Sequence, residues 1–264
     1  MVSPWLWEQP YRPAALLLLP RGPPTGAMLV RILYIFPHPD DECFGPAPAI
    51  ARQRRDGDKV FLLTLTRGEA TKQRHRLGLS KAEMGRVRLA EMLEVEKALD
   101  LSGMTVLQFP DGRLAREDPR RLEEAVEAEI RRVRPDVVVT YAVHGISGFP
   151  DHLVTHAVVK RVFCELRDLF PEVAPRRLAF FTLAESEADD GIFRLKTSAE
   201  GDIAVAVEAS PEDMALAHRA LHCYETYLEV IEKADPLGRA GSTIYFELFG
   251  ESPPSRLESL SWGL

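Results

Sequence analysis

Residues 32–42 read ILYIFPHPDDE and join an apolar run to one histidine and three carboxylates. The apolar run is typical of a buried β-strand. The polar residues that follow it are His38, Asp40, Asp41 and Glu42. No glycine-rich phosphate loop follows the strand, which disfavours a dinucleotide-dependent oxidoreductase. Imidazole and carboxylate groups this close together at the end of a strand indicate a metal site rather than a phosphate site.

Around this stretch, segments of strand length alternate with helical patterns, as expected for a parallel sheet covered on both faces. Residues 28–264 are therefore predicted to form a single α/β domain, with a Rossmann-like, mostly parallel sheet flanked by helices on both faces. The expected strands are residues 30–36, 60–65, 104–109, 136–140, 178–183 and 203–207, the last two together at one edge. The expected helices are residues 46–56, 80–101, 119–133, one from 151, and one that Ser210 and Pro211 open.

Residues 1–27 differ from the rest because they are rich in proline and carry only a short apolar run, residues 14–19. That run is too short to span a bilayer. We expect a poorly structured N-terminal extension and no membrane span; a secretion signal is the alternative.

Composition narrows the class of protein. A chain of 264 residues can bury a full core. The formal net charge of −7 argues against nucleic acid as the main partner. Cys43, Cys164 and Cys223 are widely spaced and form no CxxC pair. Neither a disulfide framework nor a thiolate zinc site is indicated, so a cytoplasmic location is expected.

Polar residues follow each of the first four predicted strands. His38 to Glu42 follow the first strand, Gly68 and Glu69 the second, and Asp111 the third. A loop that contains His144 follows the fourth strand, and His152 comes next. Because ligands of open α/β sheets bind at the carboxyl ends of the strands, these side chains are expected to converge.

His38, Asp41 and His152 are the candidate metal ligands. Two imidazoles and one carboxylate leave a coordination position open, as in catalytic rather than structural zinc sites. Zn²⁺ is the expected ion, with Fe²⁺ as the alternative. Such an ion lowers the pKa of bound water to about 7. Asp40 is the candidate general base, and Glu42 is expected to support a ligand histidine or backbone amides.

These residues resemble a family of metal-dependent sugar de-N-acetylases, the PIG-L or LmbE-like family. The matching motifs are PHPDDE at residues 37–42 and PDH at residues 150–152, with weaker matches in the same order along the chain. The resemblance implies that His38, Asp41 and His152 bind zinc, with Asp40 as general base and later acid. It also implies that Arg88 and Asp111 contact sugar hydroxyls. The implied substrate is a small N-acetylated amino-sugar conjugate, and a homo-oligomer is implied.

One position departs from the family pattern. The second motif of the family usually begins with a histidine that stabilises the oxyanion, and Phe149 stands there in this chain. His144 lies five residues earlier and is the expected replacement. Alternatively, Phe149 marks a changed substrate or a metal-bearing protein that binds a sugar or nucleotide without turnover.

Structural alternatives exist for several of these residues. Arg88 and Glu91 also fit an exposed i, i+3 ion pair on a helix. Asp111 also fits a plain turn residue in its Pro-Asp-Gly sequence. His156 lies one turn after His152, where a supporting or packing role is expected.

Overall fold

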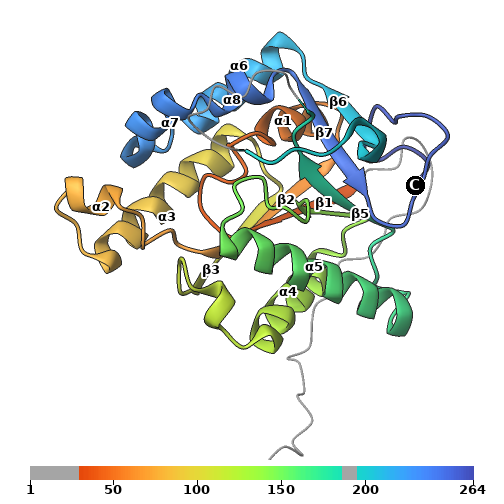
Figure 1. The fold of residues 1–264 in the computed structure, drawn as a ribbon, viewed down its shortest axis with the longest axis horizontal. Coiled ribbons are helices and arrows are strands. Elements are labelled where there is room, and N and C mark those ends of the chain that lie inside the picture. Colours follow the sequence, from red (N-terminus) through yellow and green to blue (C-terminus); the bar gives the residue numbers. More distant parts are fainter. Residues whose placement is uncertain (1–29, 186–194) are drawn as a thin grey trace, which may run out of the picture.

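The computed structural model describes residues 30–185 and 195–264. Within them, one seven-stranded sheet has helices on both faces, which confirms the predicted α/β fold (Figure 1). The expected extension, residues 1–27, lies outside the described residues, and the division of the chain at residue 28 stays a prediction. The strands are β1 (Arg31–Phe36), β2 (Lys59–Thr66), β3 (Gly103–Phe109), β4 (Val137–Tyr141), β5 (Arg177–Thr182), β6 (Val205–Glu208) and β7 (Thr243–Leu248).

The order of the strands positions the site. The sheet runs β3-β2-β1-β4-β5-β7-β6, and the first five strands in this order are parallel to one another. β1 is buried from Ile32 to its end because helices cover both of its faces. The chain moves outward from β1 on both sides, through β2 to β3 and through β4 to β5. The direction of the chain thus reverses between β1 and β4, and folds of this kind bind ligands at the carboxyl ends of the strands at such a point.

The far edge of the sheet differs from the prediction. Residues 178–183 and 203–207 were expected to share that edge, but β7 lies between β5 and β6 and pairs antiparallel with both. β5 is therefore an interior strand, buried at every position. The sequence expectations do not include β7, whose TIYFEL residues alternate between partly and fully buried at its start. Such alternation is typical of an antiparallel strand with one covered face.

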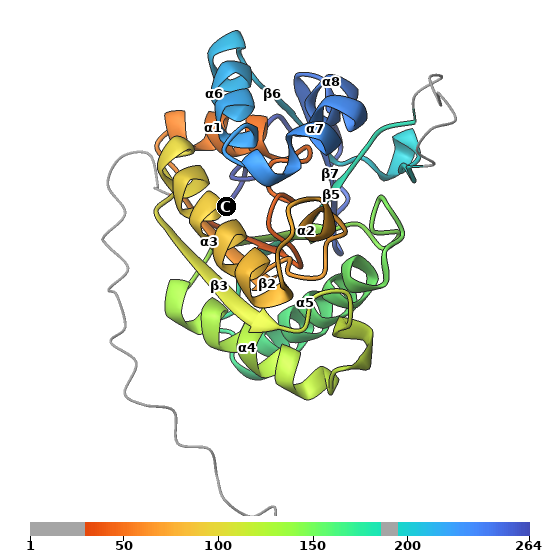
Figure 2. The same cartoon turned by 90° about the vertical axis from the view of Figure 1, so that its left-hand side faces the viewer.

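The helices enclose one apolar core on each face of the sheet. α1, α3 and α6 cover one face, and α4 and α5 cover the other (Figures 1 and 2). α6 begins as predicted, with Ser210 accepting a hydrogen bond from the Asp213 amide. None of the helices in the described ranges combines the length and apolar character that crossing a bilayer requires. The bounds are α1 (Ala47–Arg55), α2 (Gln73–Arg76), α3 (Lys81–Ala98), α4 (Pro119–Val133), α5 (Pro150–Leu169), α6 (Pro211–Leu221), α7 (Leu228–Ala234) and α8 (Pro236–Ala240).

Candidate active site

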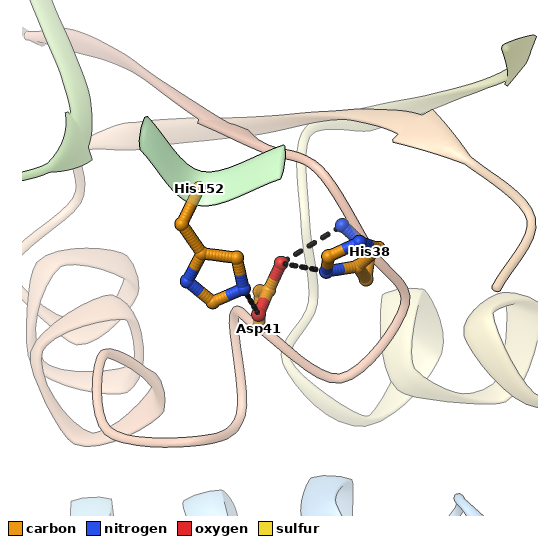
Figure 3. Close-up of side chains that lie close together, drawn as sticks. All are labelled: His38, Asp41 and His152. Atoms are coloured by element: carbon orange, nitrogen blue, oxygen red, sulfur yellow. Dashed lines mark hydrogen bonds and ion pairs between the residues drawn. The ribbon is translucent and has the colours of Figure 1, made fainter. Parts of the chain in front are cut away.

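Three side chains from two segments form a compact cluster. His38 and Asp41 lie in the turn after β1, and His152 lies in the first turn of α5 (Figure 3). One nitrogen or oxygen of each lies within 4.8 Å of the other two. The two carboxylate oxygens of Asp41 are each 3.4 Å from a ring nitrogen, Oδ2 from His38 Nδ1 and Oδ1 from His152 Nε2. The fold thus brings together the three residues that the sequence predicts as metal ligands.

A backbone carbonyl sets the orientation of the His152 ring. The carbonyl oxygen of Gly145 lies 3.0 Å from His152 Nδ1. Because a carbonyl only accepts, Nδ1 carries the proton and Nε2 turns its lone pair toward Asp41. A side chain on residue 145 would not fit, since a Cβ there would lie 2.8 Å from the Cβ of His152. The neutral imidazole is therefore held in the form that binds a metal.

Asp151 plays the same supporting part for His38. One oxygen of Asp151 lies 3.3 Å from His38 Nε2. The carboxylate also accepts the backbone N–H groups of Gly112, at 2.9 Å, and Leu114, at 3.1 Å. His38, Asp111 and Asp151 form a second group with metal-ligand spacing. Backbone amides donate to both oxygens of Asp151, which fits a supporting role for this carboxylate, and His38 Nδ1 lies on the side of Asp41.

The electrostatics of the cluster favour a cation. Burial lowers the pKa of His38, but hydrogen bonds to Asp151 and Asp41 and the charges of Asp41 and Asp111 raise it to about 10. The site thus stabilises positive charge strongly at the position of the His38 ring. Together with the donor set of two imidazoles and one carboxylate, this charge distribution fits a divalent metal ion.

Tyr141 completes the surroundings of Asp41, and sequence reasoning did not single it out. Its hydroxyl donates to Asp41 Oδ1 at 2.7 Å, and its ring stacks on His152 with centroids 4.3 Å apart. His156 Nδ1 in turn donates to the Tyr141 carbonyl at 2.8 Å, in line with the supporting role expected for His156. Tyr141 is the last residue of β4. A position at the carboxyl end of a strand next to β1 is the sequence feature that could have identified Tyr141 as a site residue.

Asp40 is held beside the cluster by Arg88. The guanidinium of Arg88 donates through Nη2 to Asp40 Oδ2 at 2.7 Å and to the Pro39 carbonyl at 2.8 Å. Burial raises the pKa of Asp40 to about 6, while the charge of Arg88 opposes this rise. The backbone of Asp40 is left-handed, with φ +87°, an uncommon conformation for a residue other than glycine and one often found at functional sites.

Arg88 is therefore not part of an exposed ion pair with Glu91, and that alternative is wrong. Arg88 is only 1% exposed, and its guanidinium packs over the ring of Tyr227 at 4.0 Å. Glu91 is also buried and accepts hydrogen bonds from the backbone and hydroxyl of Thr226. Two nitrogens of Arg88, Nε and Nη1, have no hydrogen-bond partner in the described part of the chain.

Asp111 lies close to the cluster rather than in a remote turn. Its Oδ1 is 3.4 Å from His38 Nε2, and its Oδ2 accepts the Ala70 amide at 2.6 Å. Its own amide donates to Glu69 at 3.0 Å. Gly68 allows this segment to approach Arg88, since a Cβ at residue 68 would lie 2.9 Å from Arg88 Nε. The segments after β2 and β3 therefore meet at the cluster of His38, Asp41 and His152, as the sequence predicts.

His144 and Phe149 lie on the loop between β4 and α5 in different surroundings. The polar contacts of His144 are with the Ile146 amide and the hydroxyls of Ser198 and Thr182. Phe149 is 61% exposed, and its ring meets the His152 ring edge-on at 5.7 Å. The expected catalytic role of His144 stays a prediction.

Glu42 does not contact a ligand histidine: its Oε1 accepts from the Tyr224 hydroxyl, and the backbone amide that hydrogen-bonds its carboxylate is its own. It is fully buried, and burial raises its pKa to about 7. The support that the sequence assigned to Glu42 comes instead from Asp151, for His38, and from the Gly145 carbonyl, for His152. Tyr224 lies 182 residues from Glu42, so no local pattern links the two.

Residues 33–163 match the model of the PIG-L family, which is described as GlcNAc-PI de-N-acetylase. A 1D-myo-inositol 2-acetamido-2-deoxy-alpha-D-glucopyranoside deacetylase from Thermobifida fusca is 29% identical over 220 residues, covering 70% of this chain and 74% of the relative. The chain spans about half the length of several further relatives with the same name, 44% to 52%.

Solved structures share the fold. An N,N'-diacetylchitobiose deacetylase from Pyrococcus horikoshii has a TM-score of 0.63 at 18% identity, covering 83% of each chain. A 4-carboxy-2-hydroxymuconate hydratase from Pseudomonas putida has a TM-score of 0.61 at 14% identity, covering 86% of this chain and 99% of that one. A deacetylase and a hydratase both have this fold, so the fold alone does not identify the reaction. The reaction has to be inferred from the residues of the site.

Proposed function

This chain carries a deacetylase domain of the PIG-L (LmbE-like) family, and from that premise we propose that it is a metal-dependent N-deacetylase. It would hydrolyse the N-acetyl group of an amino-sugar conjugate to acetate and a free amine. The observation that carries the proposal is the cluster of His38, Asp41 and His152, with Asp40 beside it. The relatives that match are named for deacetylation of such a conjugate, which supports the substrate class.

We assign the metal to His38 Nδ1, an oxygen of Asp41 and His152 Nε2. A divalent ion held there, Zn²⁺ or Fe²⁺, would polarise the amide carbonyl and make water more acidic. Asp151 and the Gly145 carbonyl would hold the two imidazole rings in the orientation that aims them at the ion.

Asp40 is the proposed proton carrier. Its carboxylate would take a proton from the attacking water and deliver it to the amine that leaves. Burial and the charge of Arg88 act in opposite directions on its pKa and bring it to about 6. A group with a pKa near the working pH both accepts and releases a proton readily.

The sugar is proposed to bind through Arg88 and Asp111. Two nitrogens of the buried Arg88 lack a hydrogen-bond partner among residues 30–185 and 195–264, and a sugar hydroxyl would supply the missing acceptor. Asp111 has an oxygen near His38, at the edge of the cluster, and would accept from a sugar hydroxyl.

Removal of the metal is expected to abolish acetate release, and its return is expected to restore it. The test incubates the protein with a panel of N-acetylglucosamine conjugates before and after dialysis against a chelator. Readdition of Zn²⁺ or Fe²⁺ to separate samples identifies the ion that supports turnover. Activity that persists after metal content has fallen to background would refute a metal-dependent reaction.

The same panel tests the alternative that Phe149 suggests. A protein that binds amino sugars without turnover would retain an intact N-acetyl ligand and release no acetate. Released acetate with an equimolar free amine supports the enzyme instead.

Asp111→Asn is expected to raise KM for the sugar conjugate and to change kcat little. A lost hydrogen bond to a charged group costs about 1.5–3 kcal/mol, or roughly 10- to 100-fold in binding. Steady-state kinetics and metal content are measured together, with Asp56→Asn, an exposed carboxylate at the end of α1, as the control. If metal content falls with activity, Asp111 supports His38 rather than the substrate.

A further inference from the structure

The loop between β4 and α5 contains an unusual backbone conformation next to the metal cluster. Gly145 and Ile146 both have positive φ, +64° and +54°. Glycine adopts this left-handed region freely, but a β-branched residue such as isoleucine rarely does. A conformation of this kind persists only where its surroundings impose it.

The imidazole of His144 is one of the groups that hold this turn. Its Nδ1 accepts the backbone N–H of Ile146 at 3.0 Å. The carbonyl of Ile146 accepts the Lys196 amide at 2.8 Å, and the Ile146 side chain is only 8% exposed in the core. Both backbone polar groups and the side chain of Ile146 are therefore fixed.

A chain of hydrogen bonds determines which nitrogen of His144 carries the proton. Since Nδ1 accepts from an amide, the proton of the neutral ring is on Nε2. Nε2 lies 3.3 Å from the hydroxyl of Ser198, and that hydroxyl donates to Glu247. The carboxylate of Glu247 thus orients Ser198 to accept from His144. Burial lowers the pKa of His144, in keeping with a neutral ring.

The turn acts directly on His152. The carbonyl of Gly145, the residue between His144 and Ile146, accepts the proton on His152 Nδ1 at 3.0 Å. The direction of that carbonyl depends on the backbone conformation of Gly145 and Ile146. We propose that His144 is a positioning residue of the metal site, which holds the left-handed turn at Ile146 and so aims the Gly145 carbonyl at His152. This inference rests on the proposed function of His152 as a metal ligand.

Two substitutions of similar size separate the two nitrogens of His144. Asparagine places its oxygen near the position of Nδ1 and accepts the amide two residues later, as in Asx turns. Glutamine is one carbon longer, so its amide group reaches toward the position of Nε2 and misses the Ile146 amide. His144→Asn is expected to keep the metal affinity of the wild type, whereas His144→Gln is expected to lower it about 10- to 100-fold.

The measurement is the equilibrium affinity for Zn²⁺ by competition with a chromophoric chelator, together with the absorption spectrum of the Co²⁺-loaded protein. His144→Gln should weaken Zn²⁺ binding and alter the Co²⁺ bands, and His144→Asn should do neither. His218→Ala, an exposed histidine of α6, is the control and should behave as the wild type.

Each contrary result has a distinct meaning. Equal Zn²⁺ affinity in the wild type and both variants would overturn the positioning role. If His144→Gln retained turnover while His144→Asn lost it, both with intact Zn²⁺ affinity, His144 would act on the substrate through Nε2, and the positioning role would also be overturned. A wild type that binds no metal would refute the proposed function itself, and with it the role assigned here.

Discussion

Asp40→Asn is expected to lower kcat for acetate release by about 10²- to 10⁴-fold, the usual contribution of a general base. Asparagine has the same shape but accepts no proton at neutral pH. It also tolerates the left-handed backbone that residue 40 adopts, with φ +87°, so the turn after β1 should keep its conformation. The metal ligands on that turn should therefore remain in place.

Metal content and kcat are measured on the same preparation. Asp100→Asn is the matched control, because Asp100 is an exposed aspartate that also has a positive φ, +49°. It should retain full activity and metal content. A variant at residue 40 that loses metal and activity together would show that Asp40 helps to hold the ion and is not the proton carrier.

His152→Ala is expected to have the second largest effect, a loss of tight metal binding and with it of turnover. The substitution removes one of three ligands and leaves the Gly145 carbonyl without the Nδ1 proton. The loss of affinity should exceed the 10- to 100-fold that removal of a supporting residue typically costs. Metal bound after gel filtration is the measurement.

His218→Ala controls for the loss of an imidazole elsewhere, and circular dichroism verifies that both variants fold. If His152→Ala retained the metal content of the wild type, His38 and Asp41 would have to bind the ion with other residues. The second group, with Asp111 and Asp151, would then be the place to look.

The sequence predicts the parallel part of the fold and the metal cluster for the same reason. Parallel strands that alternate with helices end at one edge of a sheet, so the residues that follow β1 and β4 had to converge. His38 and His152 could therefore be paired although 114 residues separate them. β7 escaped prediction because a short alternating segment near the end of the chain resembles an exposed loop until its partner strands are known.

Partners that depend on tertiary packing could not be predicted. The PHPDDE motif marks Asp40 and Glu42 but contains nothing about Arg88 or Tyr224, which reach them from α3 and from the segment after α6. The contact of Arg88 with the substrate is predicted only from the resemblance to the family, because nothing in the local sequence indicates that this arginine is buried. Its contact with Asp40 follows from how α3 packs against the turn, and local periodicity does not describe that packing.

Two aromatic side chains from the C-terminal part of the chain pack against Arg88. The guanidinium packs under Tyr227 and near Tyr224, at 4.0 and 5.3 Å from the ring centroids, and Tyr224 also reaches Glu42. The ligands His38, Asp41 and His152 all belong to the first part of the chain, up to α5. The low dielectric around Asp40 and Arg88, by contrast, depends on residues 224–227. Tyr224 and Tyr227 thus shield the Arg88 side of the ion pair with Asp40 from solvent, and a shielded ion pair interacts more strongly than an exposed one.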